Sequence, residues 1–209
     1  MPDAIFEGVA ITYALVAVNV VVSLVGFWAL RKERYRPHFV FIPSKANPAR
    51  SWVGAVLSHF AHGDVGHLFL NLLALYLFGP RVEEALGPVA YLVVYLLSGA
   101  FGSFFVWLFH RKNRRYAALG ASGSIAGVIF ASIVVAPGGE LLLLVFPVPV
   151  PAPIFALLYL VVSSLKMGGR DGVAHEAHIG GAVAGLVLAG LLFDDGFAPL
   201  IRAVTRLVG

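Results

Sequence analysis

Long runs of apolar residues constrain this chain more than any other feature of its sequence. The run from Val9 to Leu30 contains no charged residue, and neither does the run from Val89 to Phe109. A helix needs about 20 predominantly apolar residues to cross the hydrocarbon core of a bilayer. Both runs are long enough, so the sequence predicts membrane-spanning helices and a lipid bilayer around them.

The composition supports this prediction. Hydrophobic residues make up 59% of the chain and charged residues only 12%, whereas soluble domains are about 25% charged. Cysteine is absent, which excludes disulfides, thiol nucleophiles and cysteine-ligated zinc. The formal net charge is only +4, and we expect no nucleic-acid partner.

Further apolar runs complete a set of six expected helices in a single domain over residues 1–209. Gly79-Pro80 is expected to end the second helix, and the prolines from Pro147 to Pro153 are expected to form an interfacial or re-entrant connector. The fold class is therefore all-α, a polytopic six-helix membrane bundle. Its expected helices are Val9–Leu30, Val65–Phe78, Val89–Phe109, Ser122–Ala136, Ile154–Leu165 and Ala174–Phe193.

Shorter segments lie outside these helices. The start, Met1-Pro2-Asp3, has no basic stretch, so we expect a retained helix to follow rather than a signal peptide. The apolar segment Trp52–Leu57 is too short to span and is expected to be interfacial or buried. The tail, which carries Arg202 and Arg206, is expected to form an amphipathic surface helix.

Ionisable residues inside an apolar helix are costly, so each is a functional candidate. The second expected helix is preceded or opened by His59, His62, His67 and Asn71. His67 and Asn71 are four apart and therefore share one helical face, whereas His62 is expected in the loop or cap before the helix. The alternative is structural: His59, His110 and His175 lie near helix ends and would be solvated, and Arg81, Glu83 and Glu84 would form a network in a loop.

A serine and a histidine begin two of the other expected helices. Ser122 lies between Gly120 and Gly123, and free N–H groups at a helix start can stabilise an oxyanion. A serine hydroxyl needs a base to remove its proton, and imidazole is the usual base. His178 is followed by Gly181 and Gly185, whose spacing lets helix backbones approach closely. A serine in a membrane helix otherwise bonds to its own helix or to a neighbour.

Taken together, these motifs resemble the rhomboid family of intramembrane serine proteases. The resemblance rests on three ordered motifs: His62-x4-His67-x3-Asn71 continuing to Gly79 and Glu83, then Gly120-Ala121-Ser122-Gly123, then Ala177-His178-x2-Gly181-x3-Gly185.

The resemblance implies a rhomboid-like bundle that cleaves transmembrane segments of other proteins without a cofactor or metal. In that family pattern Ser122 is the nucleophile and His178 the general base. Asn71, His67 and the Ser122 N–H form the oxyanion site, and His62, Gly120, Gly123, Gly181 and Gly185 are supporting residues. Cleavage would take place near one membrane face, and water would reach the dyad through a cavity that opens toward the loops on that face.

The chain departs from the family pattern at two positions. Rhomboids often carry an aromatic residue four positions after the nucleophile, where this chain has Ala126. The Trp-Arg pair common in the first loop is also missing, because Val53 follows Trp52.

The resemblance implies a multi-pass protein of the cell (plasma) membrane with its N-terminus inside and the mouth of the site outside. The charges predict the opposite. Every Lys and Arg except Arg81, Arg202 and Arg206 falls after the first, third or fifth expected helix, on the side of the site. The positive-inside rule places that side in the cytoplasm. The sequence does not predict an oligomeric state.

Other functions fit less well. A helical zinc protease motif requires His-Glu-x-x-His, and His175-Glu176-Ala177-His178 is one residue short. An α/β-hydrolase elbow needs glycine where Ser124 stands. A triad with Glu176 fails because residues two apart on a helix do not face each other. A transporter should show broken helices in two related halves, which the sequence lacks. A catalytically weak rhomboid-like protein that binds membrane helices is the main alternative.

Overall fold

Helices make up most of the described chain. The computed structural model describes residues 8–45, 52–138, 140–142, 149–151, 154–155, 158 and 174–208. Its elements in order are α1 (Ala10–Ala29), 3-10 turns at Arg36–His38 and Pro43–Lys45, α2 (Trp52–Leu57), α3 (Val65–Leu86), α4 (Pro88–His110), α5 (Ser122–Val135), β1 (Glu140–Leu142), β2 (Pro149–Pro151), α7 (His175–Leu192) and α8 (Ala198–Val208).

The helices α1, α3, α4 and α7 are long and apolar enough to cross a membrane, and α5 is apolar but shorter. The chain is therefore an all-α polytopic membrane protein, as the sequence predicted, and the described residues contain four to five apolar helices. The fifth expected helix, Ile154–Leu165, lies outside the described residues except for Ile154, Phe155 and Leu158, which are helical. The count of six helices stays a prediction.

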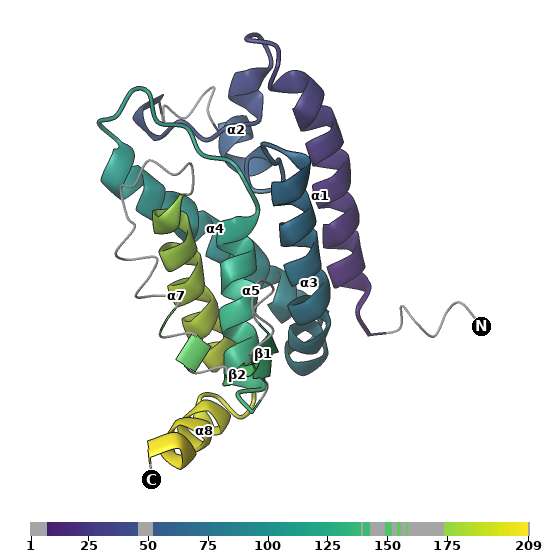
Figure 1. The fold of residues 1–209 in the computed structure, drawn as a ribbon, viewed down its shortest axis with the longest axis vertical. Coiled ribbons are helices and arrows are strands. Elements are labelled where there is room, and N and C mark those ends of the chain that lie inside the picture. The colour runs from purple at the N-terminus through teal and green to yellow at the C-terminus, as the bar shows by residue number, and fades with distance from the viewer. Residues whose placement is uncertain are drawn as a thin grey trace, which may run out of the picture.

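The short helix α5 lies at the centre of the bundle (Figure 1). It packs against α3, α4 and α7, whereas α1 packs mainly against α3 at one side. Nearly every side chain of α5 is buried. The outer helices instead expose large apolar side chains such as Val21 (60%), Leu24 (61%) and Leu191 (72%). A core of buried small residues with an apolar exterior is the arrangement expected in lipid.

Glycines set the contact between α5 and α7. A Cβ atom added to Gly181 would collide with the backbone of Gly123, and one added to Gly185 would collide with Gly127. The carbonyl oxygen of Ala177 in α7 would lie 2.8 Å from a Cβ at Gly102 of α4 and 3.3 Å from one at Gly123 of α5. The three backbones approach so closely because these positions lack side chains. The predicted close-packing role of Gly181 and Gly185 is consistent with this geometry.

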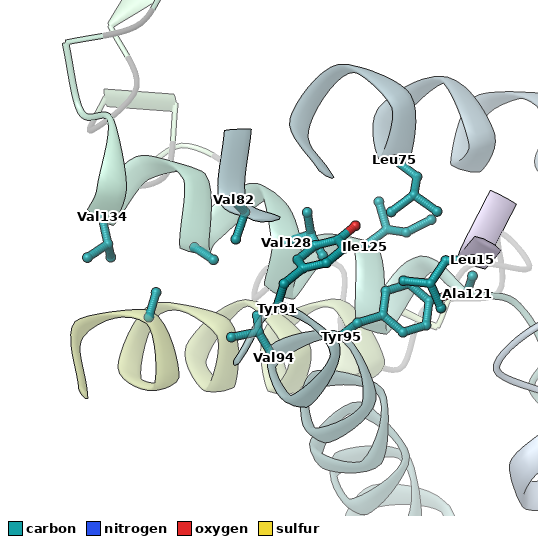
Figure 2. Packing of buried hydrophobic residues seen from close by; sticks show 12 residues of the cluster. Leu15, Leu75, Val82, Tyr91, Val94, Tyr95, Ala121, Ile125, Val128 and Val134 are labelled. Atoms are coloured by element: carbon teal, nitrogen blue, oxygen red, sulfur yellow. The ribbon is translucent and has the colours of Figure 1, made fainter. Parts of the chain in front are cut away.

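Buried apolar residues from several helices fill the space around α5. Figure 2 shows this cluster, in which two tyrosines of α4, Tyr91 and Tyr95, point among Leu15, Val128 and Ile125. The hydroxyl of Tyr95 accepts a hydrogen bond from Asn19 Nδ2 at 3.0 Å, which links α4 to α1. This polar pair satisfies groups that would otherwise be unpaired in the interior.

The prediction that Gly79-Pro80 ends the second helix was wrong, because α3 continues to Leu86 with Pro80 inside it. The reason is Glu83, which the sequence analysis placed in a loop network and which is in fact 1% exposed. Its carboxylate accepts hydrogen bonds from the backbone N–H groups of Ile11 (2.8 Å) and Thr12 (2.7 Å) and from the Thr12 hydroxyl (2.8 Å). These bonds hold the last turn of α3 in place and cap the start of α1.

The other two members of that expected network, Arg81 and Glu84, are exposed on α3.

The proline-containing connector includes a strand pair. Strands β1 and β2 run antiparallel, with Leu141 opposite Val150. Proline is tolerated at the edge of a sheet, where its missing N–H breaks no ladder bond. The tail forms α8, which contacts α5 at the end of the bundle opposite α2 (Figure 1).

Candidate active site

The start of α3 positions the first motif. Asp64 precedes the helix and its Oδ1 accepts a hydrogen bond from the His67 N–H at 2.8 Å, which is an N-cap. His67 and Asn71 then lie on one face of the first two turns, and Asn71 Nδ2 donates to the His67 carbonyl at 2.8 Å. Asn71 is only 6% exposed. Its amide is therefore held in place, with a second N–H left for another acceptor.

His62 lies before α3, as predicted, and is fully buried. Its Nδ1 is 2.8 Å from the Ser23 hydroxyl of α1, and its ring meets the ring of His67 edge-on at 5.0 Å. Burial, and then the neighbouring His67, lower the pKa of His62 from 6.5 to about 4. His62 is thus neutral at physiological pH and packs against the ring of His67.

Gly120 brings Ser122 to His67. Its φ of +132° is a conformation that L-residues with side chains rarely adopt, and its N–H donates to the Ser58 carbonyl at 2.8 Å. A Cβ at Gly120 would lie 2.7 Å from His67 Cε1 and 3.7 Å from Ser122 Oγ. The His67 ring and the serine hydroxyl therefore flank the same glycine. A side chain at position 120 would occupy the space between them.

Ser122 is the first residue of α5, and no side chain caps that helix start. The N–H groups of its first turn accordingly point toward the end of the helix that faces His67.

The third motif lies in the first turn of α7. The Ala177 carbonyl faces Gly123 of α5, and Gly181 contacts the Gly123 backbone directly. His178 is three residues before Gly181 and so shares its helical face. This places His178 on the side of α7 that packs against α5, one turn nearer to the end where α5 begins with Ser122.

The structure thus brings His62, His67, Gly120 and Ser122 together at one end of the bundle. It places Gly123, Gly181 and Gly185 in the neighbouring helix contact, with His178 on the same face. Ala126 lies deeper, in a buried cluster with Phe130, Ile133 and Ala182. Ala126 offers no aromatic ring to His178. The ring of His175 lies edge-on to the ring of His178, with centroids 5.9 Å apart.

A small cavity adjoins Ser122. Its volume is about 30 Å³, and its lining includes Phe41, His59, Ser103, Gly120 and Ser122. This space is large enough to hold a water molecule. His59 was already a candidate from the sequence, whereas no motif indicated Ser103, which lies on α4 and contacts the His59 ring.

Three histidines that were expected to be solvated are not. His59 Nε2 contacts the Gly99 carbonyl (2.8 Å) and the Ser103 hydroxyl (2.9 Å). His175 is 8% exposed, and His110 lies 3.2 Å from the carboxylate of Glu176. The expectation failed for His59 and His110 because each ring meets a partner from another helix. The ring of His175 lies edge-on to that of His178 within α7.

Fold and site define a multi-pass α-helical membrane protein whose serine and histidine motifs gather at one end of the bundle. A family model described as the Rhomboid domain matches residues 49–195, and the chain belongs to the rhomboid family of membrane serine proteases.

Curated relatives agree with this assignment. Rhomboid protein 1, mitochondrial, of Saccharomyces cerevisiae is 32% identical over 186 residues, which cover 85% of this chain and 51% of the yeast protein. RHOMBOID-like protein 12, mitochondrial, of Arabidopsis thaliana is 29% identical, with 63% and 44% covered. Rhomboid protease AarA of Providencia stuartii is 28% identical, with 66% and 55% covered. The chain spans about half the length of these relatives.

Proposed function

We propose that this protein is an intramembrane serine protease that cleaves transmembrane segments of other membrane proteins through Ser122 and His178. The observation that carries the proposal is the arrangement around Gly120. The start of α5 presents Ser122 beside His67 at that glycine, while the first turn of α7 packs its backbone on Gly123. Three sequence motifs thereby meet at one end of the bundle.

The proposed reaction needs no group beyond these side chains and water. His178 accepts the proton of the Ser122 hydroxyl as Oγ attacks the carbonyl carbon of the scissile peptide bond. The negative charge that develops on the carbonyl oxygen is stabilised by the Ser122 N–H and by the side chains of Asn71 and His67. His178 then gives its proton to the leaving amine, and an acyl-enzyme forms. Water deprotonated by His178 hydrolyses that ester and restores the serine.

Labelling with a serine-directed fluorophosphonate probe tests the nucleophile. We expect wild-type protein in detergent to be labelled and Ser122→Ala not to be labelled, because only an activated hydroxyl attacks the phosphorus centre. In-gel fluorescence and mass spectrometry of the labelled peptide give the readout. Labelling at a different residue, or equal labelling of Ser122→Ala, would contradict the proposed nucleophile.

Asn71 is expected to contribute one oxyanion donor. Asn71→Ala should lower kcat for cleavage of a transmembrane reporter by about 10²–10³, the usual effect of removing one such donor. The measurement is the initial rate of reporter cleavage in proteoliposomes. A suitable control is Asn113→Ala, since Asn113 lies in the exposed turn after α4. An unchanged rate in Asn71→Ala would remove this residue from the site.

One alternative is a catalytically weak relative that binds membrane helices. Ala126 favours it, because no aromatic side chain at this position supports His178. The probe separates the two, since a weak enzyme is labelled slowly or not at all. The metal-dependent alternative has less support: within the described ranges, no three His, Asp or Glu side chains cluster as metal ligands would.

Location follows from the family only in part. The protein is an integral, multi-pass membrane protein, and two of the relatives above carry the word mitochondrial in their names. Those names give no support to the expected plasma membrane location, which is not part of the proposal.

A further inference from the structure

A buried acid, a histidine and a tyrosine form a cluster between the first turn of α7 and the end of α4. Glu176 of α7 is 2% exposed, and its Oε1 lies 3.2 Å from Nε2 of His110 at the end of α4. The ring of Tyr116, in the loop after α4, stacks on the ring of His110 with centroids 3.6 Å apart and planes at 7°. The 3.2 Å separation is short enough for an ion pair when the His110 ring is protonated.

This cluster touches both chain segments that carry the dyad. Glu176 is two residues before His178, so it points to a different side of α7 and reaches α4 while His178 faces α5. Tyr116 lies six residues before Ser122. Burial, and then the Glu176 charge, raise the pKa of Tyr116 to about 12, so its hydroxyl stays neutral beside the carboxylate.

The loop from Tyr116 to Ser122 is anchored at every second residue. After the turn closed by the Asn113 N–H bond to the His110 carbonyl, Tyr116 stacks on His110. Ala118 then pairs with Phe41 through two backbone bonds of 2.8 and 3.0 Å, and the Gly120 N–H bonds to Ser58. The stack on His110 is the first of these anchors and the one that is linked to α7.

The first turn of α7 contacts both neighbouring helices. Its backbone at Ala177 lies close to Gly102 of α4 and to Gly123 of α5. The pair between Glu176 and His110 adds a side-chain contact between this turn and the end of α4. A side-chain contact away from the helix axis resists rotation of the turn, and the direction of the His178 side chain depends on that rotation.

We infer that Glu176 is a positioning residue: its contact with His110, backed by Tyr116, holds the turn that carries His178 and the loop that leads to Ser122 in register. This inference rests on the proposed protease function. A purely structural reading differs in a measurable way. Removing one partner of a buried pair can lower stability, and a purely structural role would make the labelling rate fall only in step with the amount of folded protein. A positioning role predicts a loss of labelling in protein that is still folded.

The test uses Glu176→Gln and His110→Gln in the full chain, purified in detergent. The rate constant for fluorophosphonate labelling of Ser122, and kcat and KM for reporter cleavage, are measured beside the thermal midpoint. We expect each variant to label about ten- to a hundredfold more slowly, in line with the effect of small misplacements of reacting groups. KM should stay within about twofold, because the pair does not contact the proposed substrate site.

The double variant should label no more slowly than the slower single variant, because both substitutions break the same contact. Glu84→Gln is the matched control, since Glu84 is exposed on α3 and belongs to neither site. Wild-type labelling rates in both single variants would overturn the inference, as would losses that multiply in the double variant. A loss of labelling that follows the loss of folded protein would also overturn it. Unlabelled wild-type protein would instead refute the proposed protease function itself.

Discussion

Ser122→Ala and His178→Ala are each expected to reduce cleavage of a transmembrane reporter to background, a loss on the order of 10⁴ or more in kcat. The loss is this large because the two groups act as one unit: without the imidazole the hydroxyl keeps its proton, and without the hydroxyl no acyl-enzyme forms. Reporter cleavage in proteoliposomes, followed by the appearance of the shorter fragment, measures the effect.

Two matched controls separate loss of chemistry from loss of fold. Ser132→Ala removes a serine of the same helix whose hydroxyl bonds back to the Ile129 carbonyl at 2.6 Å. His38→Ala removes an exposed histidine of a 3-10 turn. Both controls should cleave at about the wild-type rate, and all four variants should keep the wild-type thermal midpoint within a few degrees. Cleavage at the wild-type rate by Ser122→Ala or His178→Ala would refute the dyad.

Glu83→Ala is expected to give the largest loss of stability, with the free energy of unfolding lowered by about 3–5 kcal/mol. The substitution deletes three hydrogen bonds to a buried carboxylate and leaves the N–H groups of Ile11 and Thr12 unpaired. It also releases the last turn of α3 after Pro80. Unfolding in a mixed-detergent titration, monitored by circular dichroism, measures the change.

The neighbouring acid provides the comparison for Glu83. Glu84→Ala has the same chemistry on the exposed side of the helix and should change the free energy of unfolding by less than about 0.5 kcal/mol. The loss in the free energy of unfolding for Glu83→Gln should lie between those for Glu83→Ala and Glu84→Ala. The single carbonyl oxygen of glutamine replaces only part of the carboxylate as a hydrogen-bond acceptor. Equal stabilities for Glu83→Ala and Glu84→Ala would show that the cap on α1 contributes nothing measurable.

The boundaries of α1 and α4 were predictable because they depend on local features. The apolar run Val89–Phe109 corresponds to α4 at Pro88–His110, and the run Val9–Leu30 corresponds to α1 at Ala10–Ala29. Asp64 and Gly87 mark helix ends through their own backbone and side-chain chemistry. Pro80 did not indicate the true helix end because the contact that keeps α3 continuous comes from α1, 71 and 72 residues away from Glu83 in the chain.

The same limit applies to the site. Sequence motifs identified Ser122, His67 and Asn71 as candidates, since their residue types and spacing reflect the proposed chemistry. The partners of His59 are 40 and 44 residues away, and that of His110 is on α7, so no local pattern indicated them. Polar residues near helix ends look solvated in a sequence until the packing of the neighbouring helices is known.

The shortness of α5 has a consequence for depth in the bilayer. At 1.5 Å per residue, its 14 residues extend about 21 Å, whereas the hydrocarbon layer is about 30 Å thick. A helix that reaches one surface must therefore begin about 9 Å beneath the other, and Ser122 is its first residue. Peptide bonds at that depth belong to the interior turns of a partner's helix, where every carbonyl is already engaged. If the proposed function holds, the preferred substrates should be segments whose helices open easily at that level, through glycine or proline.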